Sequence, residues 1–243
     1  NGCYGETNFT VETKPIPSFS VPTNIETCSG TNAEISITDG TAETYTITWT
    51  TGNTTLVNGN TTYTTEGLTE SRTYTITGSL DGCSSEPKTA TVTVNALPKI
   101  LIDSDPLSKE ICIGDSAKLT ASGAGGNGTY TWTTTDGLTV DNTDNSKAVA
   151  KPTSVGEKTY KVTGFNGTCS GKDSIKLTVH GLPTVTIAQT PLGKVCEGTS
   201  TELSASGATS YIWNDGTSER TGNVINPIIS KETTFTVTGT DAN

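Results

Sequence analysis

One block of sequence recurs three times along this chain, and the recurrence constrains the fold more than any other feature. The block has the form Cys-x-Gly-x-Ser/Asn-x-x-Leu/Ile and reads CSGTNAEI from Cys28, CIGDSAKL from Cys112 and CEGTSTEL from Cys196. Self-similarity of this kind is typical of chains built from successive copies of one structural unit. We therefore expect a series of small domains and not one large globule.

Each block is followed by alternating segments that predict β-strands. The first segment carries large residues two positions apart, and a later one has the form Thr-aromatic-x-Ile/Val-Thr-Gly. Because alternate residues of a strand point to the same face, the large side chains should lie together on the side that faces a core. The first segments are Ile47-Thr48-Trp49, Tyr130-Thr131-Trp132 and Tyr211-Ile212-Trp213, and the later ones are 73–78, 159–164 and 234–239.

Tight turns and proline-containing joints separate the repeats. Asp81-Gly82 and Asn166-Gly167 favour positive φ and predict hairpins, and the alternating segments after them end at Leu97-Pro98 and Leu182-Pro183. Each proline lacks an amide hydrogen and fixes φ, which suits a short stiff joint. The predicted organisation is a last strand of another repeat at 1–14, followed by repeats at 15–97, 98–182 and 183–243.

The two ends of the chain complement each other. Residues 1–14 match a last strand without its domain, with Phe9 and Val11 at the inward positions, and the third repeat matches a domain without its last strand. One interpretation is that the chain is one period of a longer polypeptide, which we favour. The other is a subunit whose first strand completes the third domain of a neighbour, because a sandwich that lacks a strand exposes an unpaired edge.

Composition excludes several classes of function. The formal net charge of -10 opposes binding to phosphate backbones and anionic lipid surfaces. One histidine, no methionine and 31% hydrophobic residues leave few groups for catalysis and no large core. We expect no enzyme activity, no cofactor, no metal ion, no nucleic-acid partner and no membrane insertion. Six cysteines at recurring positions without CxxC pairs favour disulfides and an oxidising, extracellular compartment.

The motifs resemble a known group of repeats. Cys-x-Gly-x-Ser-x-x-Leu, Tyr-x-Trp, Thr-Tyr-x-Val-Thr-Gly and Asn-Gly-Cys look like the immunoglobulin-like or PKD-like repeats of giant Bacteroidota surface proteins, of which SprB-like gliding adhesins are an example. The first repeat departs from the pattern with Ile47 in place of the aromatic residue and Asn32 in place of serine. The resemblance implies type IX secretion and an extracellular, cell-surface location on an outer membrane.

The predicted fold class is all-β, with tandem immunoglobulin-like β-sandwich repeats in an elongated rod. One tryptophan per repeat at the same strand position is typical of a core residue in such sandwiches, and a strand tyrosine in this position can cap the backbone with its hydroxyl. Phe235 lacks that hydroxyl. The predicted core residues are Trp49, Trp132, Trp213, Tyr74, Tyr160 and Phe235.

The strand order of such a sandwich suggests which cysteines can bond. It places the cysteine before the second strand and the cysteine after the last hairpin at opposite ends of a domain, roughly 25 Å apart at about 3.3 Å per residue. A disulfide needs Cα atoms about 4.4 to 6.8 Å apart. We therefore favour a bond between successive repeats, Cys28 with Cys169, and pairing of the other four with adjacent units: Cys112 with an equivalent of Cys3, and Cys196 with an equivalent of Cys83. Bonds within repeats (Cys28 with Cys83, Cys112 with Cys169) and free or metal-bound thiols are the alternatives.

Few other residues suggest chemistry. Asp-Ser-Ala at Ser116 and Asp-Ser-Ile at Ser174 resemble a short O-glycosylation signal of Bacteroidota, although chance accounts for such tripeptides too. The acidic pairs Asp103 with Asp105 and Asp141 with Asp144 lack the spacing of a calcium loop and are interpreted as solvated loop charge.

The sequence predicts a structural or adhesive segment of an extracellular bacterial surface fibre or gliding-type adhesin, stiffened by disulfide-strapped domains. Its expected partners are neighbouring repeats of the same fibre, with surface polysaccharide or another cell-surface ligand as further candidates. One alternative is an accessory stalk or carbohydrate-binding module of a secreted polysaccharide-degrading enzyme. Another is the subunit of a strand-exchanging, pilus-like polymer.

Overall fold

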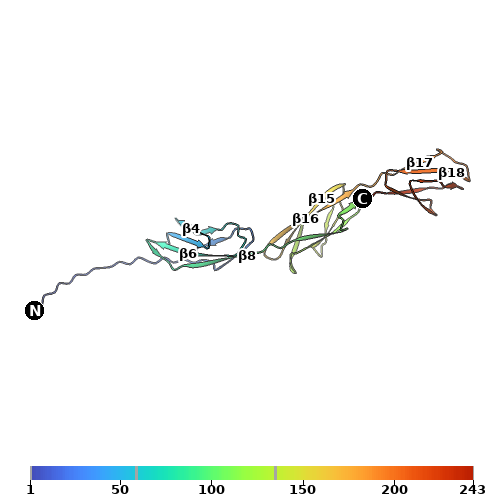
Figure 1. Ribbon diagram of the computed structural model, residues 1–243. Coiled ribbons are helices and arrows are strands. Elements are labelled where there is room, and N and C mark those ends of the chain that lie inside the picture. Colours follow the sequence, from blue (N-terminus) through green and yellow to red (C-terminus); the bar gives the residue numbers. More distant parts are fainter. Residues whose placement is uncertain (1, 58–59, 134–135, 243) are drawn as a thin grey trace. The chain divides into compact units, whose positions relative to one another are not determined.

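The computed structural model describes residues 2–57, 60–133 and 136–242, and every regular element among them is a β-strand. The chain forms two compact units. The first contains residues 1–100 with the turns 123–129 and 164–171, and the second contains 101–122, 130–163 and 172–243. The described strands fall into the stretches 24–95, 101–180 and 186–240, and in Figure 1 β6 and β8 run side by side in the first of these.

The first repeat is a two-sheet sandwich. β1, β8, β6, β3 and β4 lie in that order in one sheet, with β7 paired to β6, while β2 pairs with β5 in the other sheet. Ile35 from the smaller sheet and Ile47, Ile76 and Val92 from the larger one are fully buried between them. The strands described are β1 (Asn24–Cys28), β2 (Glu34–Ser36), β3 (Thr44–Trp49), β4 (Gly52–Val57), β5 (Thr62–Thr64), β6 (Arg72–Leu80), β7 (Cys83–Ser84) and β8 (Lys88–Asn95).

The second repeat is also a two-sheet sandwich, with four described strands in each sheet. One sheet has the order β10, β16, β15, β12, and the other has the order β13, β14, β11, β9. Leu119 of the second sheet and Val162 and Leu177 of the first close the core. The strands described are β9 (Leu101–Asp105), β10 (Glu110–Cys112), β11 (Ala117–Ser122), β12 (Thr129–Thr133), β13 (Leu138–Val140), β14 (Lys147–Ala150), β15 (Gly156–Phe165) and β16 (Ser170–His180).

The third repeat is smaller, and its core is less covered by strands. Its sheets have the orders β17, β19, β22 and β21, β20, β24, and β18 pairs separately with β23. Leu203 and Ile225 meet Tyr211 and Trp213 in a small core. The strands described are β17 (Thr186–Thr190), β18 (Thr199–Ser200), β19 (Glu202–Ser206), β20 (Ser210–Asn214), β21 (Glu219–Thr221), β22 (Val224–Ile225), β23 (Ile228–Ile229) and β24 (Thr236–Thr240).

These strand orders and paired sheets define immunoglobulin-like sandwiches, so the expected all-β fold class is confirmed. A short strand near the start of each of the first two repeats pairs in parallel with the last strand of the same repeat: β1 with β8, and β10 with β16. The cysteines Cys28 and Cys112 are the final residues of these short strands. Each therefore lies beside the point at which the chain leaves its repeat.

The predicted core aromatic residues differ in burial. Trp132, Trp213, Tyr74 and Tyr160 are buried. Trp49 and Phe235 are partly buried and pack against their cores. In the first repeat Tyr45 and Ile47 are the fully buried pair on β3, so Trp49 at the end of the strand lies at the margin of the core. There its ring contacts Tyr63 and Tyr74, with centroid distances of 5.7 and 5.5 Å.

The segment at 2–14 forms no strand in this chain. Its residues are exposed, including Tyr4 at 94%, Phe9 at 89% and Val11 at 75%. The prediction that residues 1–14 form the last strand of another repeat is not tested within this chain.

Candidate functional site

Cys28 is held at the end of the parallel strand pair of the first repeat. β1 and β8 are in register from Asn24 opposite Thr91 to Cys28 opposite Asn95. The amide of Ser29 then donates to the carbonyl oxygen of Asn95 at 2.9 Å. The backbone on both sides of Cys28 is therefore fixed, and its side chain lies next to the segment that leads to Pro98.

Cys169 is held by the last hairpin of the second repeat. The side-chain oxygen of Asn166 accepts from the amides of Thr168 at 3.0 Å and Cys169 at 2.8 Å. Gly167 supplies the positive φ of 96° that this turn needs. The hairpin thus presents a sulfur atom from a rigid turn, on a residue that is 1% exposed.

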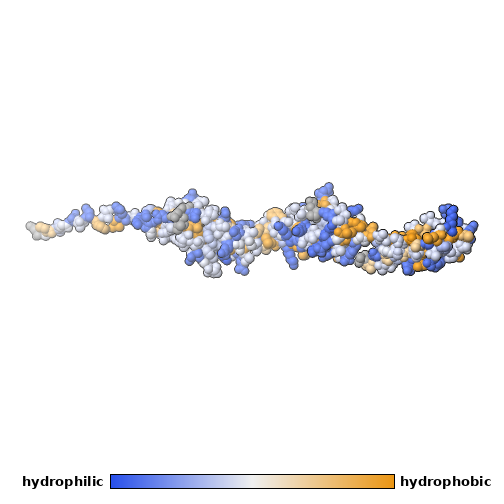
Figure 2. Space-filling model, turned by 90° about the horizontal axis from the view of Figure 1, so that it is seen from above, coloured by the Kyte–Doolittle hydropathy of each residue, from blue (hydrophilic) through white to orange (hydrophobic). Residues whose placement is uncertain are grey.

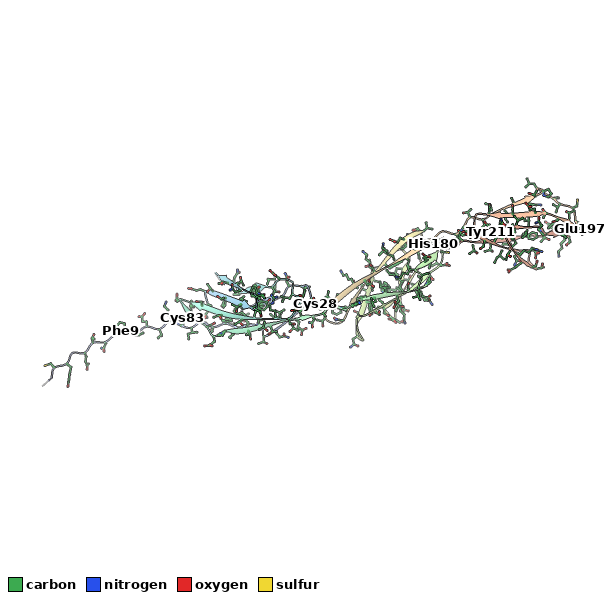
Figure 3. All side chains as sticks on the ribbon, in the orientation of Figure 1. Phe9, Cys28, Cys83, His180, Glu197 and Tyr211 are labelled. Atoms are coloured by element: carbon green, nitrogen blue, oxygen red, sulfur yellow. A yellow bond between two sulfur atoms is a disulfide. The ribbon has the colours of Figure 1, made fainter. Side chains whose placement is uncertain are left out.

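These two cysteines form a disulfide. Their Cα atoms are 5.8 Å apart, and 141 positions separate them in the sequence. The Cys28 sulfur lies 3.6 Å from the carbonyl oxygen of Thr168, and the Cys169 sulfur lies 3.8 Å from that of Asn95. The bond is the inter-repeat pairing favoured above. It contradicts the alternative bonds of Cys28 with Cys83 and of Cys112 with Cys169, because each would need a sulfur that is already bonded. Figure 3 shows Cys28 and Cys83 at opposite ends of the first repeat.

Two glycines allow the joint backbone to pass close to the second repeat. A Cβ added to Gly171 would lie 2.0 Å from the carbonyl oxygen of Pro98, and one added to Gly123 would lie 2.0 Å from that of Lys99. Ile100 is 5% exposed and lies against the backbone of Gly171 and Gly164. The joint is therefore packed backbone to backbone as well as bonded through sulfur.

The other cysteines carry no disulfide in this chain. They are Cys3 and Cys196, which are exposed, and Cys83 and Cys112, which are partly exposed. Cys112 lies opposite His180 at the end of the pair β10 and β16, which is the position that Cys28 has opposite Asn95. It lines a pocket of ≈ 500 Å³ together with Pro106, Glu110 and His180. Pairing of these four thiols with adjacent units stays a prediction.

Tyr160 makes the backbone bond expected of its position. Its hydroxyl donates to the carbonyl oxygen of Asp136 at 3.0 Å, and burial raises the pKa of the phenol. The Asp136 carboxylate accepts from the hydroxyl and amide of Thr153 at 2.7 and 3.0 Å and pairs with Lys158 at 3.0 Å. These donors lower the pKa of Asp136 to about 2.

The carboxylates of Asp141 and Asp144 accept hydrogen bonds from residues of their own loop. Asp141 accepts from the amides of Thr143 and Asp144, and Asp144 accepts from Ser146 and pairs with Lys147 at 2.8 Å. Hydrogen bonds from Thr143 lower the pKa of Asp141, and those from Lys147 and Ser146 lower the pKa of Asp144. In the part of the chain that the structure describes, no group of three or more His, Cys, Asp or Glu side chains is placed to hold a metal ion.

The candidate glycosylation residues are both on the surface. Ser116 is exposed just before β11, and Ser174 is exposed on β16. Modification of their hydroxyls stays a prediction. The roles of Gly123 and Gly171 at the joint were not predicted from the sequence, although a glycine two residues after a hairpin cysteine also occurs at Gly5.

Comparison with known proteins gives no family. No protein-family model matches the chain, and no curated protein matches its sequence. Among solved structures, a three-domain fragment of titin is 17% identical, covers 93% of this chain and 93% of its own, and has a TM-score of 0.33. The N-terminal eight immunoglobulin domains of Down Syndrome Cell Adhesion Molecule are 14% identical, with 93% of this chain and 42% of that chain covered and a TM-score of 0.37. The fold of the present chain is defined by its own strand order and cores.

The described residues contain no helix long and apolar enough to cross a membrane.

Proposed function

We propose that this chain is a structural and adhesive segment of an extracellular bacterial surface fibre, resembling the repeats of Bacteroidota adhesins exported by type IX secretion, and that it has no catalytic activity of its own. The observation that carries the proposal is the disulfide between Cys28 and Cys169, which joins one repeat to the next. In this role the repeats serve as spacers, and their mutual orientation is part of the function.

The joint supports this role through two connections between the same pair of repeats. The peptide chain crosses through Pro98, whose φ is fixed, and the disulfide crosses from β1 to the hairpin at Cys169. A single flexible connection allows bending about any axis, whereas two separated connections restrict bending and twisting. Close packing of Gly171 against Pro98 adds a steric limit. The joint is therefore built for stiffness.

The surface supports a solvated, extracellular role. A net charge of -10 keeps such domains soluble and opposes adsorption to anionic polymers. Many exposed threonine and asparagine side chains offer weak polar contacts, whose sum over many repeats can give useful avidity for surface polysaccharide or another cell-surface ligand. Partner recognition on this view belongs to the assembled fibre.

The stiffening role of the Cys28–Cys169 disulfide is tested by comparing the chain with the variant Cys28→Ser/Cys169→Ser in small-angle X-ray scattering. We expect a broader distribution of particle dimensions in the variant, because only the linker then joins the two repeats. The matched control is Cys3→Ser/Cys83→Ser, which removes two unbonded thiols. Equal distributions for the variant and the unmodified chain would contradict a stiffening role.

The location is tested in the source cells with an antibody against the repeats. We expect intact cells to bind the antibody and added protease to remove the epitope. Labelling that requires permeabilised cells would contradict the surface role.

A further inference from the structure

In the second repeat, three donor side chains near the core find partners in loops of the same repeat. The Tyr160 hydroxyl donates to the carbonyl oxygen of Asp136, and the Lys158 ammonium pairs with the carboxylate of the same residue, each at 3.0 Å. The indole N–H of Trp132 donates to the carbonyl oxygen of Asn145 at 3.0 Å. The second repeat therefore satisfies these donors with its own backbone and its own carboxylate.

The equivalent donors of the first repeat have no such partners. By the alignment of the repeats, Arg72 is equivalent to Lys158 and Trp49 to Trp132. In the described parts of the chain, Arg72 forms no ion pair, and no hydrogen bond joins its guanidinium or the indole N–H of Trp49 to another protein group. The first repeat thus leaves unused two donors whose equivalents are bonded in the second.

Three aromatic rings meet beside these donors. Trp49 of β3, Tyr63 of β5 and Tyr74 of β6 contact one another, with centroid distances of 5.7, 5.5 and 5.7 Å. A Cβ added to Gly52 would lie 2.7 Å from the indole carbon Cζ2, so a glycine on β4 is what lets the indole lie over the backbone there. Tyr74 is buried, whereas Trp49 and Tyr63 are partly exposed. The exposed part of the cluster is therefore an aromatic surface held in place by packing.

Two side chains of opposite charge lie near this cluster. Alternation along β6 places Arg72 on the same face as Tyr74, and Arg72 is half-buried. Burial raises the pKa of the Tyr63 phenol, and the charge of Glu66 also raises it whereas that of Arg72 lowers it. Both charged groups therefore act on the Tyr63 hydroxyl, yet no ion pair joins them among the residues that the structure describes. A half-buried guanidinium without a carboxylate partner is a binding group for an anionic ligand.

These groups together suit a sugar ring that carries a carboxylate. Aromatic rings accommodate the C–H face of a pyranose, polar side chains around them fix its hydroxyls, and a guanidinium binds a carboxylate through two parallel N–H groups. On the face of the first repeat that Figure 2 shows, the surface is mostly hydrophilic or intermediate in hydropathy, which fits a hydrated ligand better than an apolar one. The net charge of -10 opposes non-specific adsorption of acidic polymers, so binding depends on the local contacts.

We propose that Trp49, Tyr63 and Arg72 bind a uronic acid unit of an acidic polysaccharide. The sugar ring lies against the exposed parts of the indole and phenol rings. Its carboxylate accepts hydrogen bonds from Arg72, and one of its hydroxyls donates to the exposed carboxylate of Glu66. This inference rests on the proposed adhesive function, because it names the chemical class of the ligand and the repeat that binds it.

The other two repeats do not reproduce this arrangement. In the second, Trp132 is buried and Lys158 is already paired. In the third, Trp213 is fully buried, and its N–H donates to the carbonyl oxygen of Gly222 at 2.9 Å. Thr233 has the place of Arg72 there. The proposed site therefore belongs to the first repeat.

Titration of the complete chain with uronate oligosaccharides tests the site. The probes are the tetramers of galacturonate and of mannuronate, with the tetramer of galactose as the neutral comparison, in calorimetry at about 0.15 M salt to screen long-range repulsion. We expect at least one uronate tetramer to bind with a Kd below about 1 mM, and the galactose tetramer to bind at least about 10-fold more weakly. The bound uronate tetramer should also lower the quenching of tryptophan fluorescence by iodide, because Trp49 is more exposed than Trp132 and Trp213.

Substitutions locate the binding. Arg72→Gln removes the guanidinium and should weaken uronate binding at least about 10-fold. Tyr63→Phe keeps the ring and removes one hydroxyl, and it should weaken the binding of the uronate and galactose tetramers alike. The matched control is Lys118→Gln, which removes an exposed cation of the second repeat and should leave binding unchanged. Circular dichroism and urea midpoints check that each variant is folded.

Three results would overturn the proposal. They are no binding of either uronate tetramer, a galactose tetramer that binds as well as the uronates, and uronate binding that is as strong in a folded Arg72→Gln as in the unmodified chain. An equal loss in Lys118→Gln would also overturn it, because general charge attraction would then account for the binding. None of these results bears on the spacer role of the repeats, since the scattering comparison at Cys28 and Cys169 involves no sugar.

Discussion

At the scale of single residues, the Tyr160 hydroxyl fixes a loop to the core of the second repeat. It donates to the carbonyl oxygen of Asp136 from a ring that is fully buried. Tyr160→Phe keeps the ring and leaves that carbonyl without its partner, so we expect the free energy of unfolding to fall by about 1 kcal/mol. Urea denaturation measures the change. Tyr4→Phe, at an exposed position, is the control and should have no effect; an equal loss in both variants would contradict the role of the bond.

Asp136 makes the same loop sensitive to acid. Its pKa is about 2 in the folded chain, below the ordinary value of 3.8, because Thr153 and Lys158 donate to the carboxylate. A lowered folded-state pKa gives stability that is complete above about pH 4 and is lost as the pH falls towards 2. We expect the urea midpoint of Asp136→Asn to be lower than that of the unmodified chain at pH 7, and the two to converge near pH 2. Parallel profiles for Asp136→Asn and the unmodified chain would contradict the assignment.

At the scale of elements, the sequence predicts the main strands and the cores because they depend on local alternation. The segments 73–78 and 159–164 lie within β6 and β15, and Trp132 and Trp213 are buried as the pattern indicates. Trp49 is less buried than expected because Tyr45 and Ile47 are the two residues of β3 that face the core. Aligning the three tryptophans therefore gives the wrong position for the buried pair in the first repeat. β4 was not predicted either, since Gly52–Val57 is a polar edge strand held by its pairing with β3.

Contacts between elements were harder to predict than the elements themselves. The parallel pairing of β1 with β8 joins residues far apart in the sequence, and neither strand carries a local sign of it. The Cys28 to Cys169 bond could nevertheless be predicted, because the required distance excludes cysteines at opposite ends of one sandwich. The glycine contacts at the joint depend on backbone positions that no side-chain pattern records.

Gly171 gives an element-scale test of the joint. Its hypothetical Cβ meets the Pro98 carbonyl oxygen, and a backbone atom cannot move aside as a side chain does. Gly171→Ala should therefore lower the free energy of unfolding by about 1 to 3 kcal/mol. In Gly181→Ala the added Cβ would meet its nearest neighbour, Val155, at 3.8 Å, so this control should change stability little. Thermal and urea unfolding compare the two, and equal stabilities would contradict close packing at Pro98.

At the scale of the whole molecule, each sandwich has its own core and the disulfide acts between sandwiches. Closing a loop of 141 residues stabilises the folded state by at most about 5 kcal/mol in the chain-entropy account. We expect Cys28→Ser/Cys169→Ser to keep its β-sheet circular dichroism at 25 °C while its urea midpoint falls. Dithiothreitol should have the same effect on the unmodified chain and none on the variant. Loss of folded structure on reduction would mean that the repeats cannot fold without the bond.

The position of this bond also affects the order of maturation. A disulfide inside a domain can form while that domain is still unfolded and can trap a wrong pairing. The sulfurs of Cys28 and Cys169 approach each other only when β1 has paired with β8 and the hairpin after β15 has formed in the next repeat. Oxidation at this site therefore follows the folding of two successive repeats, and a thiol left free here indicates that one of the two has not reached its native structure.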